Sequence, residues 1–179
     1  MAIIVPEPVA IERLIEVDRA ASSLFAPTGL LTPEALMDAV GSDDLLSALN
    51  NGWLLAAVID DAPATGFVMA SRRGNGLYID QISVDPAYGR RGIGRALMQG
   101  IENLALQNNL REMTLSTFRD LPWNAPFYAG LGFRPIRRRD LEPFMQAIEA
   151  AQAPFMDISK RTFMRKRLRK PLFRGRKPT

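Results

Sequence analysis

Hydrophobic residues recur every three to four positions along several parts of the chain, which is the spacing of an amphipathic helix. The clearest case follows residue 92, where Ile93, Leu97 and Ile101 fall on one face. A threonine followed by proline and glutamate at residues 32–34 marks the start of another helix. The predicted helices span residues 11–24, 33–41, a short stretch from 42, 93–108, 125–131 and 141–152.

Short apolar runs bounded by Gly, Pro, Asn and Asp predict strands. The predicted strands span residues 3–5, 53–59, 66–70, 77–84, 113–117 and 133–136. The turn-forming stretches DDAPAT and RRGNG join the second, third and fourth runs, which favours antiparallel hairpins. The fourth and fifth runs flank the helix at 93–108, and such a crossover predicts a parallel pair with a right-handed connection.

These elements predict an α+β fold with a mixed, mostly antiparallel central sheet flanked by helices. A chain of 179 residues with 47% hydrophobic content suits one core, so a single domain over residues 1–168 is expected. The segment RTFMRKRL at 161–168 fits either a last strand or a basic helical turn. Residues 169–179 are charged and broken by proline, and are expected to form a basic, disordered tail.

Charge is distributed unevenly along the chain. The last twenty residues contain ten Lys or Arg and no acid, whereas residues 1–159 contain 13 basic and 19 acidic residues. The net charge of +4 therefore comes from the C-terminal end, and the body is mildly acidic. Such an end, with Phe163 and Phe173 in it, would attract RNA or another acidic surface, although a solvated extension explains it equally well.

The chain contains no histidine and no cysteine, which narrows its chemistry. A Ser-His-Asp or Cys-His relay, a disulfide and a His/Cys zinc site are excluded. The acid pairs at 43–44 and 60–61 lack the spacing of a calcium loop, so no metal is expected. The sequence shows no targeting signal, and its longest apolar run, residues 53–59, is too short to cross a membrane, which predicts a cytoplasmic protein.

The sequence VDPAYGRRGIGRALM, residues 84–98, joins a predicted strand to a predicted helix through a glycine-containing loop. First-turn amides of a helix have no intrahelical partner and lie in the positive end of its dipole, so this junction favours an anion. Gly92 and Gly94 let a ligand approach the backbone, and Arg90, Arg91 and Arg95 match phosphate oxygens. A pyrophosphate is the expected ligand, and a helix entry with packing glycines is the alternative.

Two motifs carry a resemblance to a known family. The loop lacks the dinucleotide-binding and P-loop patterns, but it resembles the coenzyme A pyrophosphate loop of the GNAT superfamily of N-acetyltransferases, Q/R-x-x-G-x-G/A, with Gly92 and Gly94 at the glycine positions. Gly89 stands where the family usually has Gln or Arg. The stretch WNAPFYAGLGF, residues 123–133, resembles the second family segment, with Asn124 and Tyr128 in register.

The resemblance implies an acetyl-CoA-dependent N-acetyltransferase, in which a primary amine of a small molecule or peptide attacks the acetyl thioester directly. It implies acetyl-CoA as co-substrate and no metal. The end of the strand before the loop would pair with the pantetheine arm, and the loop would hold the pyrophosphate. The residues that the resemblance implies at the cofactor are Ile82, Ser83, Val84, Arg90, Arg91, Gly92, Ile93, Gly94, Arg95, Asn124 and Phe127.

The resemblance also implies two catalytic residues. Tyr128 would be the general acid for the departing thiolate, and the alternative is an aromatic that covers the core. Asp80, on the strand before the loop, is the candidate general base for the acceptor amine. A surface acid beside a bulge, or an arginine partner, is the alternative for Asp80. Glu16, Asp18 or a relayed water are further candidates for the base.

The acceptor pocket is expected between the first two helices and the late loops, with Phe25 and Leu30 in its wall. A homodimer formed through the sheet edge or the last helix is compatible with the resemblance. The alternative function is a non-catalytic module of the same fold, which binds CoA, or binds nucleic acid or the ribosome through the basic tail. The missing Gln or Arg at position 89 leaves this alternative open.

Overall fold

A mixed β-sheet runs through the molecule. The computed structural model describes residues 1–60 and 62–169. Within these residues, seven strands form one sheet in the order β1-β2-β3-β4-β5-β7-β6. The strands are β1 Ala2–Ile4, β2 Leu54–Val58, β3 Gly66–Arg73, β4 Gly76–Val84, β5 Glu112–Phe118, β6 Arg134–Pro135 and β7 Arg161–Arg167.

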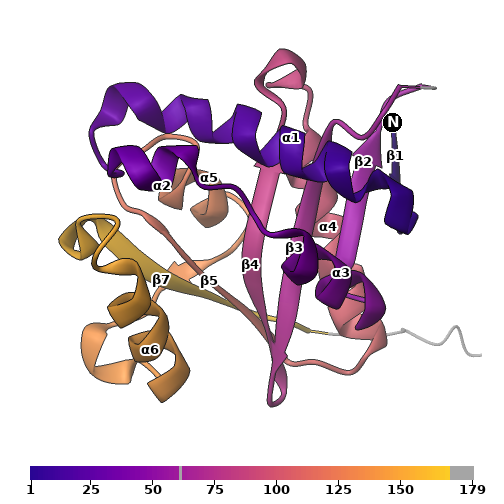
Figure 1. The fold of residues 1–179 in the computed structure, drawn as a ribbon. Coiled ribbons are helices and arrows are strands. Elements are labelled where there is room, and N and C mark those ends of the chain that lie inside the picture. The colour runs from indigo at the N-terminus through magenta and orange to yellow at the C-terminus, as the bar shows by residue number, and fades with distance from the viewer. Residues whose placement is uncertain (61, 170–179) are drawn as a thin grey trace, which may run out of the picture.

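Helices cover both faces of the sheet (Figure 1). The α-helices are α1 Ile11–Ser22, α2 Pro33–Met37, α3 Ser42–Asn50, α4 Ile93–Gln107, α5 Ala125–Ala129 and α6 Pro143–Gln152. The apolar stripe of α1 buries Leu14 in the same cluster as Phe67 of β3. The stripe of α4 buries Leu97 with the neighbouring β3 residue Val68, on the opposite face. Burial of one such leucine contributes roughly 2 kcal/mol.

The sheet opens between its two central parallel strands, β4 and β5. They pair only over residues 76–78 and 112–114. Beyond this point β5 continues to pair with β7 as far as Phe118, while β4 continues to pair with β3 as far as Val84. Figure 1 shows the two strands meeting at one end and diverging toward the other. The divergence leaves an opening in the middle of the sheet.

A bulge in β4 lies where this opening begins. Ile79 lies opposite Ala70 of β3 and Gln81 lies opposite Met69, so Asp80 has no partner on β3. An extra residue in one strand re-aims the side chains around it and increases the local twist. The bulge therefore separates the paired start of β4 from the half that borders the opening.

The predicted fold class is confirmed, and so are the antiparallel meander of β2, β3 and β4 and the parallel β4–β5 pair. The α-helix predicted over 11–24 ends at Ser22 and continues as a 3-10 helix, Ser23–Thr28, which contains Pro27. The helix predicted over 33–41 ends at Met37. Proline and the extended conformation of Asp38 end these helices before the apolar pattern ends.

The segment predicted as either a strand or a basic helical turn is the strand β7. It is inserted between β5 and β6, and pairs antiparallel with both. No helix within the described residues is long and apolar enough to cross a membrane. Of the predicted basic tail, residues 170–179 lie outside the described residues.

Candidate active site

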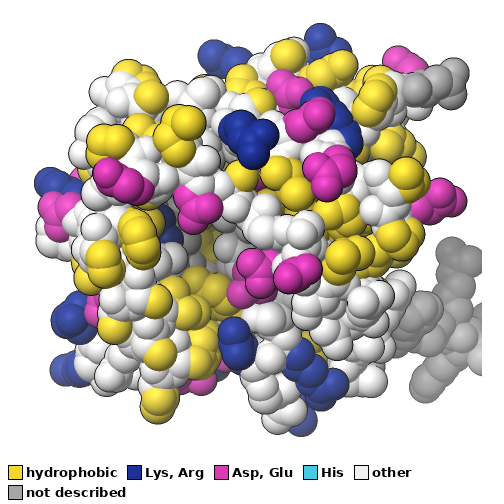
Figure 2. All heavy atoms as spheres, viewed as in Figure 1, with side chains coloured by type: hydrophobic (Ala, Val, Ile, Leu, Met, Phe, Trp, Pro, Cys, Tyr) yellow, Lys and Arg dark blue, Asp and Glu magenta, His cyan; other side chains and the backbone are white. Residues whose placement is uncertain are grey.

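The opening between β4 and β5 forms a cleft of about 1590 Å³. Its walls come from β4, β5, the loop before α4, the start of α5 and the segment from α1 to α3. Figure 2 shows the molecule hollowed near its centre, with hydrophobic side chains in the hollow and Asp and Glu side chains beside it. Most of the residues predicted to form the site line this one cleft.

The loop before α4 turns backbone amides toward a possible anion. Asp85 follows β4, and its carboxylate accepts a hydrogen bond from the Ala87 N–H at 3.0 Å. Two left-handed residues follow, Arg90 at φ 61° and Gly92 at φ 80°. An arginine in this conformation is strained, and such strain persists where the surrounding structure enforces it. Gly92 precedes α4 without a capping side chain, so the first-turn amides remain available to a ligand.

The loop arginines take different positions. Arg90 and Arg95 line the cleft. Arg91 lies with its guanidinium 5.5 Å from the centre of the Tyr88 ring and does not line the cleft. Two of the three loop arginines are therefore available to a ligand in the cleft, and the guanidinium of the third stacks on Tyr88.

The second half of β4 leaves one of its edges unpaired. Ile82, Ser83 and Val84 pair with β3 on one side, and pairing with β5 on the other side has already ended at Tyr78. All three residues line the cleft. Their free amides and carbonyls can accept an extended ligand in the way that a sheet edge accepts a strand.

Asp80 lines the same cleft at the bulge. Burial raises the pKa of its carboxyl to about 6, although a hydrogen bond from Ser71 and the charge of Arg73 oppose the shift. The Ser71 hydroxyl donates to Asp80 Oδ1 at 3.1 Å. A carboxylate with this pKa is mostly ionised at neutral pH and can still take up a proton, as a general base must.

Tyr128 lies on α5 with only 8% of its surface exposed, and its hydroxyl makes no hydrogen bond to another described residue. Burial raises the pKa of this hydroxyl, and the nearby charge of Arg161 opposes the shift. The hydroxyl therefore stays protonated at neutral pH. Its ring packs edge-on against Phe127 and Phe133, with centroid distances of 5.1 and 6.0 Å. Tyr128 thus combines a core ring with an unused donor at the cleft.

Asn124 and Phe127 line the cleft together with this tyrosine. Asn124 precedes α5 and accepts a hydrogen bond from the Thr117 hydroxyl on Oδ1 at 2.7 Å. Its Nδ2 is buried and has no partner among the described residues. A buried amide donor left unpaired is costly, so it indicates a ligand acceptor or water at this position. Phe127 lies close to Gly94, where an added Cβ would be 3.5 Å from its ring.

The two other acids considered as bases have other partners. The Asp18 carboxylate is buried and accepts hydrogen bonds from the Val40 N–H at 2.8 Å, Gln81 Nε2 at 2.7 Å and Ser83 Oγ at 2.5 Å. It ties the segment after α2 to β4, which supports a structural role. Glu16 forms an exposed ion pair with Arg13 and does not line the cleft.

One part of the cleft has an aromatic wall. Phe25 packs against Phe118 at 5.7 Å and against Trp123 at 6.4 Å between ring centroids. Phe25 lines the cleft as predicted, whereas Leu30 lies outside its lining and the neighbouring Leu31 takes part in it. The predicted acceptor wall therefore coincides with the lining of the cleft at Phe25 and not at Leu30.

Arg161, at the start of β7, is a cleft residue that the sequence analysis did not single out. Its basic neighbours along the chain made it look like part of the charged C-terminal end. The sequence offers one indication of the position of Arg161. Arg161, Phe163 and Arg165 are two positions apart, so their side chains lie on one face of a strand. Nothing in that pattern distinguishes a half-buried arginine at the cleft from an exposed one.

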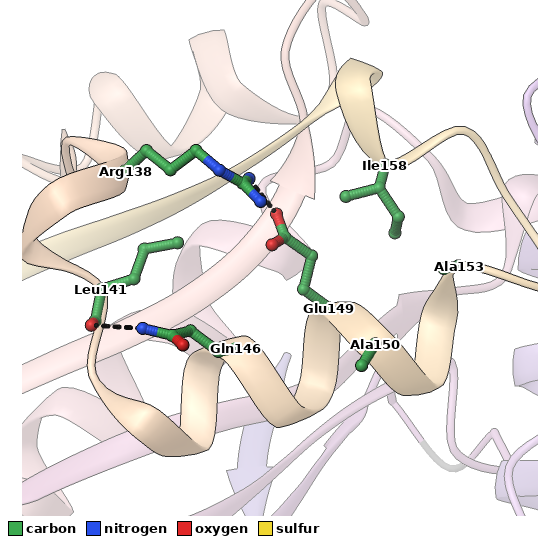
Figure 3. Close-up of a pocket in the computed structure, with 7 residues that line it drawn as sticks. All are labelled: Arg138, Leu141, Gln146, Glu149, Ala150, Ala153 and Ile158. Carbon is green, nitrogen blue, oxygen red and sulfur yellow. Dashed lines mark hydrogen bonds and ion pairs between the residues drawn. The ribbon is translucent and has the colours of Figure 1, made fainter.

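A second hollow of about 540 Å³ lies beside α6 (Figure 3). Its polar side chains already have partners: Arg138 Nη1 pairs with Glu149 Oε1 at 3.0 Å, and Gln146 Nε2 donates to the Leu141 carbonyl at 3.2 Å. This hollow therefore has less capacity to bind a polar ligand than the cleft. Within residues 1–60 and 62–169 no group of three or more metal-ligating side chains is found.

The profile of the acetyltransferase (GNAT) family matches residues 22–133, which include β4, the loop and α5. The match covers more than half of the chain. The protein therefore belongs to the GNAT acetyltransferase family, and the resemblance found in the sequence is confirmed.

Solved structures of this family share the fold. A GNAT-family acetyltransferase from Staphylococcus aureus Mu50 superposes with a TM-score of 0.70 and 21% identity, over 94% of this chain and 99% of that chain. The PaiA N-acetyltransferase from Thermoplasma acidophilum, solved with coenzyme A, superposes with a TM-score of 0.69 and 18% identity, over 93% of this chain and 98% of that chain. The ribosomal-protein-S18-alanine N-acetyltransferase from Escherichia coli superposes with a TM-score of 0.66 and 14% identity, over 97% of both chains.

Proposed function

We propose that the protein is an acetyl-CoA-dependent N-acetyltransferase that acts on a primary amine of a small molecule or peptide by direct attack. One observation carries the proposal. A single cleft brings together a free strand edge, an uncapped helix N-terminus, a carboxylate with a raised pKa and a buried tyrosine hydroxyl without a partner. The names of the structural neighbours, of which PaiA was solved with coenzyme A, support the same class of reaction.

The residues at the cleft suit coenzyme A. The loop amides and the side chains of Arg90 and Arg95 would hold the pyrophosphate. The free edge of Ile82, Ser83 and Val84 would pair with the amides of the pantetheine arm. The unpaired Asn124 Nδ2 offers a donor to the same arm.

Acetyl-CoA supplies the acetyl thioester, and the chain supplies the proton transfers. A primary amine has a pKa of roughly 10.4, so it is protonated at neutral pH. It cannot attack the thioester until it loses that proton. Asp80 accepts a proton from the acceptor amine, and Tyr128 donates its hydroxyl proton to the thiolate that leaves. A backbone N–H on the unpaired edge of β4 would donate a hydrogen bond to the thioester carbonyl and polarise it.

The test is acetyl transfer from acetyl-CoA to a pool of primary amines, with acetylated products identified by mass spectrometry and free CoA measured with a thiol reagent. Tyr128→Phe keeps the ring and removes a hydroxyl that has no protein partner, so it should fold normally. We expect kcat to fall about 100-fold or more with acetyl-CoA affinity unchanged. Unchanged kcat would remove Tyr128 from the mechanism.

The alternative of a non-catalytic module makes the opposite prediction. It requires acetyl-CoA to bind without transfer to any amine in the pool. Transfer that is lost in Tyr128→Phe would contradict that alternative.

A further inference from the structure

Arg161 carries a positive charge that no described carboxylate neutralises. No ion pair joins it to an acid within residues 1–60 and 62–169, and its Nε is buried without a hydrogen-bond partner. Nη2 donates to Ser116 Oγ at 3.1 Å, and the guanidinium lies 4.8 Å from the centre of the Phe118 ring. These two contacts fix the orientation of the guanidinium and leave most of its donors unused.

This arginine belongs to a different element from the arginines of the phosphate loop. Of the arginines that line the cleft, Arg90 and Arg95 belong to the loop and its helix, whereas Arg161 begins β7. Burial raises the pKa of the Tyr78 and Tyr128 hydroxyls, and the positive charge of Arg161 opposes both shifts. Tyr128 marks the position of the departing thiolate in the proposed function, and the charge of Arg161 acts on its hydroxyl, so we assign Arg161 to the reacting end of the cleft.

The surroundings of Arg161 make the lack of a carboxylate partner among the described residues energetically unfavourable. Burial lowers the pKa of the guanidinium, which reflects the loss of water around it. A buried charge is normally paired, and the planar fork of an arginine matches a carboxylate through two parallel hydrogen bonds. A carboxylate from a ligand would satisfy both the charge and the free Nε–H.

Tyr78 lines the cleft and lies on β4, the strand that also carries the proposed base. The charge of Asp80 raises the pKa of the Tyr78 hydroxyl and the charge of Arg161 lowers it, while burial sets the main shift, to about 12. The cleft thus carries a carboxylate from β4, which suits an amine, and a guanidinium from β7, which suits an anion. The aromatic wall of Phe25, Phe118 and Trp123 continues from the ring under Arg161.

We propose that the acceptor is a free amino acid with an apolar side chain, whose carboxylate binds Arg161 while its amine is directed to Asp80. This inference rests on the proposed acetyltransferase function. The apolar side chain would lie on the aromatic wall. Three acids of the segment from α2 to α3 also line the cleft and favour any cationic amine: Glu34, Asp38 and Asp44. Arg161 repels an acceptor with several positive charges and favours an amine that carries a carboxylate.

The test is a competition assay in which the twenty common amino acids and the amines formed from them by decarboxylation compete for acetyl-CoA. We expect the wild-type protein to acetylate one or more apolar amino acids at least about 30-fold faster, in kcat/KM, than the corresponding amines. Arg161→Met should remove this preference by lowering kcat/KM for the amino acid about 30-fold or more. The rate with the matching amine should change by less than about threefold.

Arg167→Met is the matched control, because Arg167 lies on the same strand, is exposed and does not line the cleft. It should keep the preference of the wild type. Arg161→Lys keeps the charge and loses the fork, so it should retain part of the preference even if Arg161→Met folds poorly.

Other results overturn the inference. Equal losses for amino acid and amine in Arg161→Met would show that Arg161 acts on the reaction or the fold and not on a carboxylate. Faster acetylation of the decarboxylated amines by the wild type, or acetylation of neither pool despite acetyl-CoA binding, would also contradict it. Failure to bind acetyl-CoA at all would instead contradict the proposed function.

Discussion

Asp80 shows how one residue acquires its properties from the backbone around it. The bulge leaves the backbone of Asp80 without a pairing partner on β3, and the Asp80 side chain lines the cleft. Burial raises the pKa to about 6 because the charged form loses hydration, and the Ser71 hydrogen bond and the Arg73 charge oppose this only in part. The carboxylate is therefore protonated below pH 6 and ionised above it.

This pKa predicts the pH dependence of the reaction. In the wild type, kcat/KM should rise as the pH increases through about 6, because only the ionised Asp80 can accept the proton of the amine. Asp80→Asn should lower kcat/KM about 100-fold at pH 7 and remove that inflection. The measurement is a profile of kcat/KM between pH 5 and pH 9 with one acceptor. An inflection near pH 6 that persists in Asp80→Asn would show that another group is the base.

The candidate residues differ in how far the sequence could predict them. Tyr128 and Asn124 are in a motif with fixed spacing, and Asp80 lies on a predicted strand close to the loop. The burial of Asp80 could not be predicted, because it depends on a bulge relative to β3. Arg161 was missed because its position between β5 and β6 depends on contacts between distant parts of the chain.

At the scale of elements, α1 is held to the start of the anion loop by one arginine. Arg13 Nη2 pairs with Asp85 Oδ2 at 2.8 Å, and Arg13 Nε donates to the Ala64 carbonyl at 3.0 Å. The other oxygen of Asp85 accepts from Ala87 and so shapes the turn before Gly89. Arg13 therefore positions the loop without touching the proposed ligand.

Arg13→Met should loosen this connection. We expect a loss of about 1–2 kcal/mol in the free energy of unfolding, measured by urea denaturation, because hydrogen bonds between charged groups are removed. Acetyl-CoA binding should also weaken severalfold. Arg19→Met is the matched control on the same helix, since Arg19 is exposed, and it should change neither quantity. Equal effects of the two substitutions would contradict a role for Arg13 in positioning the loop.

The elements around the loop were the most predictable part of the fold. The change from a period of 2 to a period of 3.6 after residue 84 locates β4 and α4, and the glycines locate the loop between them. The ends of α1 and α2 were less predictable, because Pro27 and the extended Asp38 interrupt the helices within an apolar pattern that continues. The order of β5, β7 and β6 leaves no local signal in the sequence.

At the scale of the whole molecule, the divergence of β4 and β5 organises the proposed function. It places the loop at one end of the cleft, and Tyr128, Asp80 and Arg161 around the other parts of its wall. Among the described residues, those that line the cleft lie between positions 18 and 161, so neither Leu168 nor Arg169, which follow β7, is one of them. The cleft and the basic end can therefore be tested separately.

A chain that ends at Arg169 should bind acetyl-CoA as tightly as the full chain. The deletion removes four Lys or Arg residues and takes the formal net charge from +4 to zero. Calorimetric titration of both chains with acetyl-CoA, and of both with RNA at low and high salt, separates the two functions. Loss of acetyl-CoA binding on truncation would contradict a site formed by the cleft alone. Salt-dependent RNA binding by the full chain alone would support the alternative role of the tail.

The most direct test of the central claim is calorimetric titration of the wild-type protein, Gly92→Glu and Gly74→Glu with acetyl-CoA. Gly92 and Gly74 both have positive φ and open space around an added Cβ, so the two substitutions impose similar backbone strain. Only Gly92 lies at the cleft, where a carboxylate would repel the pyrophosphate. We predict roughly micromolar binding by the wild type and Gly74→Glu, and at least tenfold weaker binding by Gly92→Glu. No binding by the wild type, or equal binding by all three proteins, would contradict the proposed cofactor site.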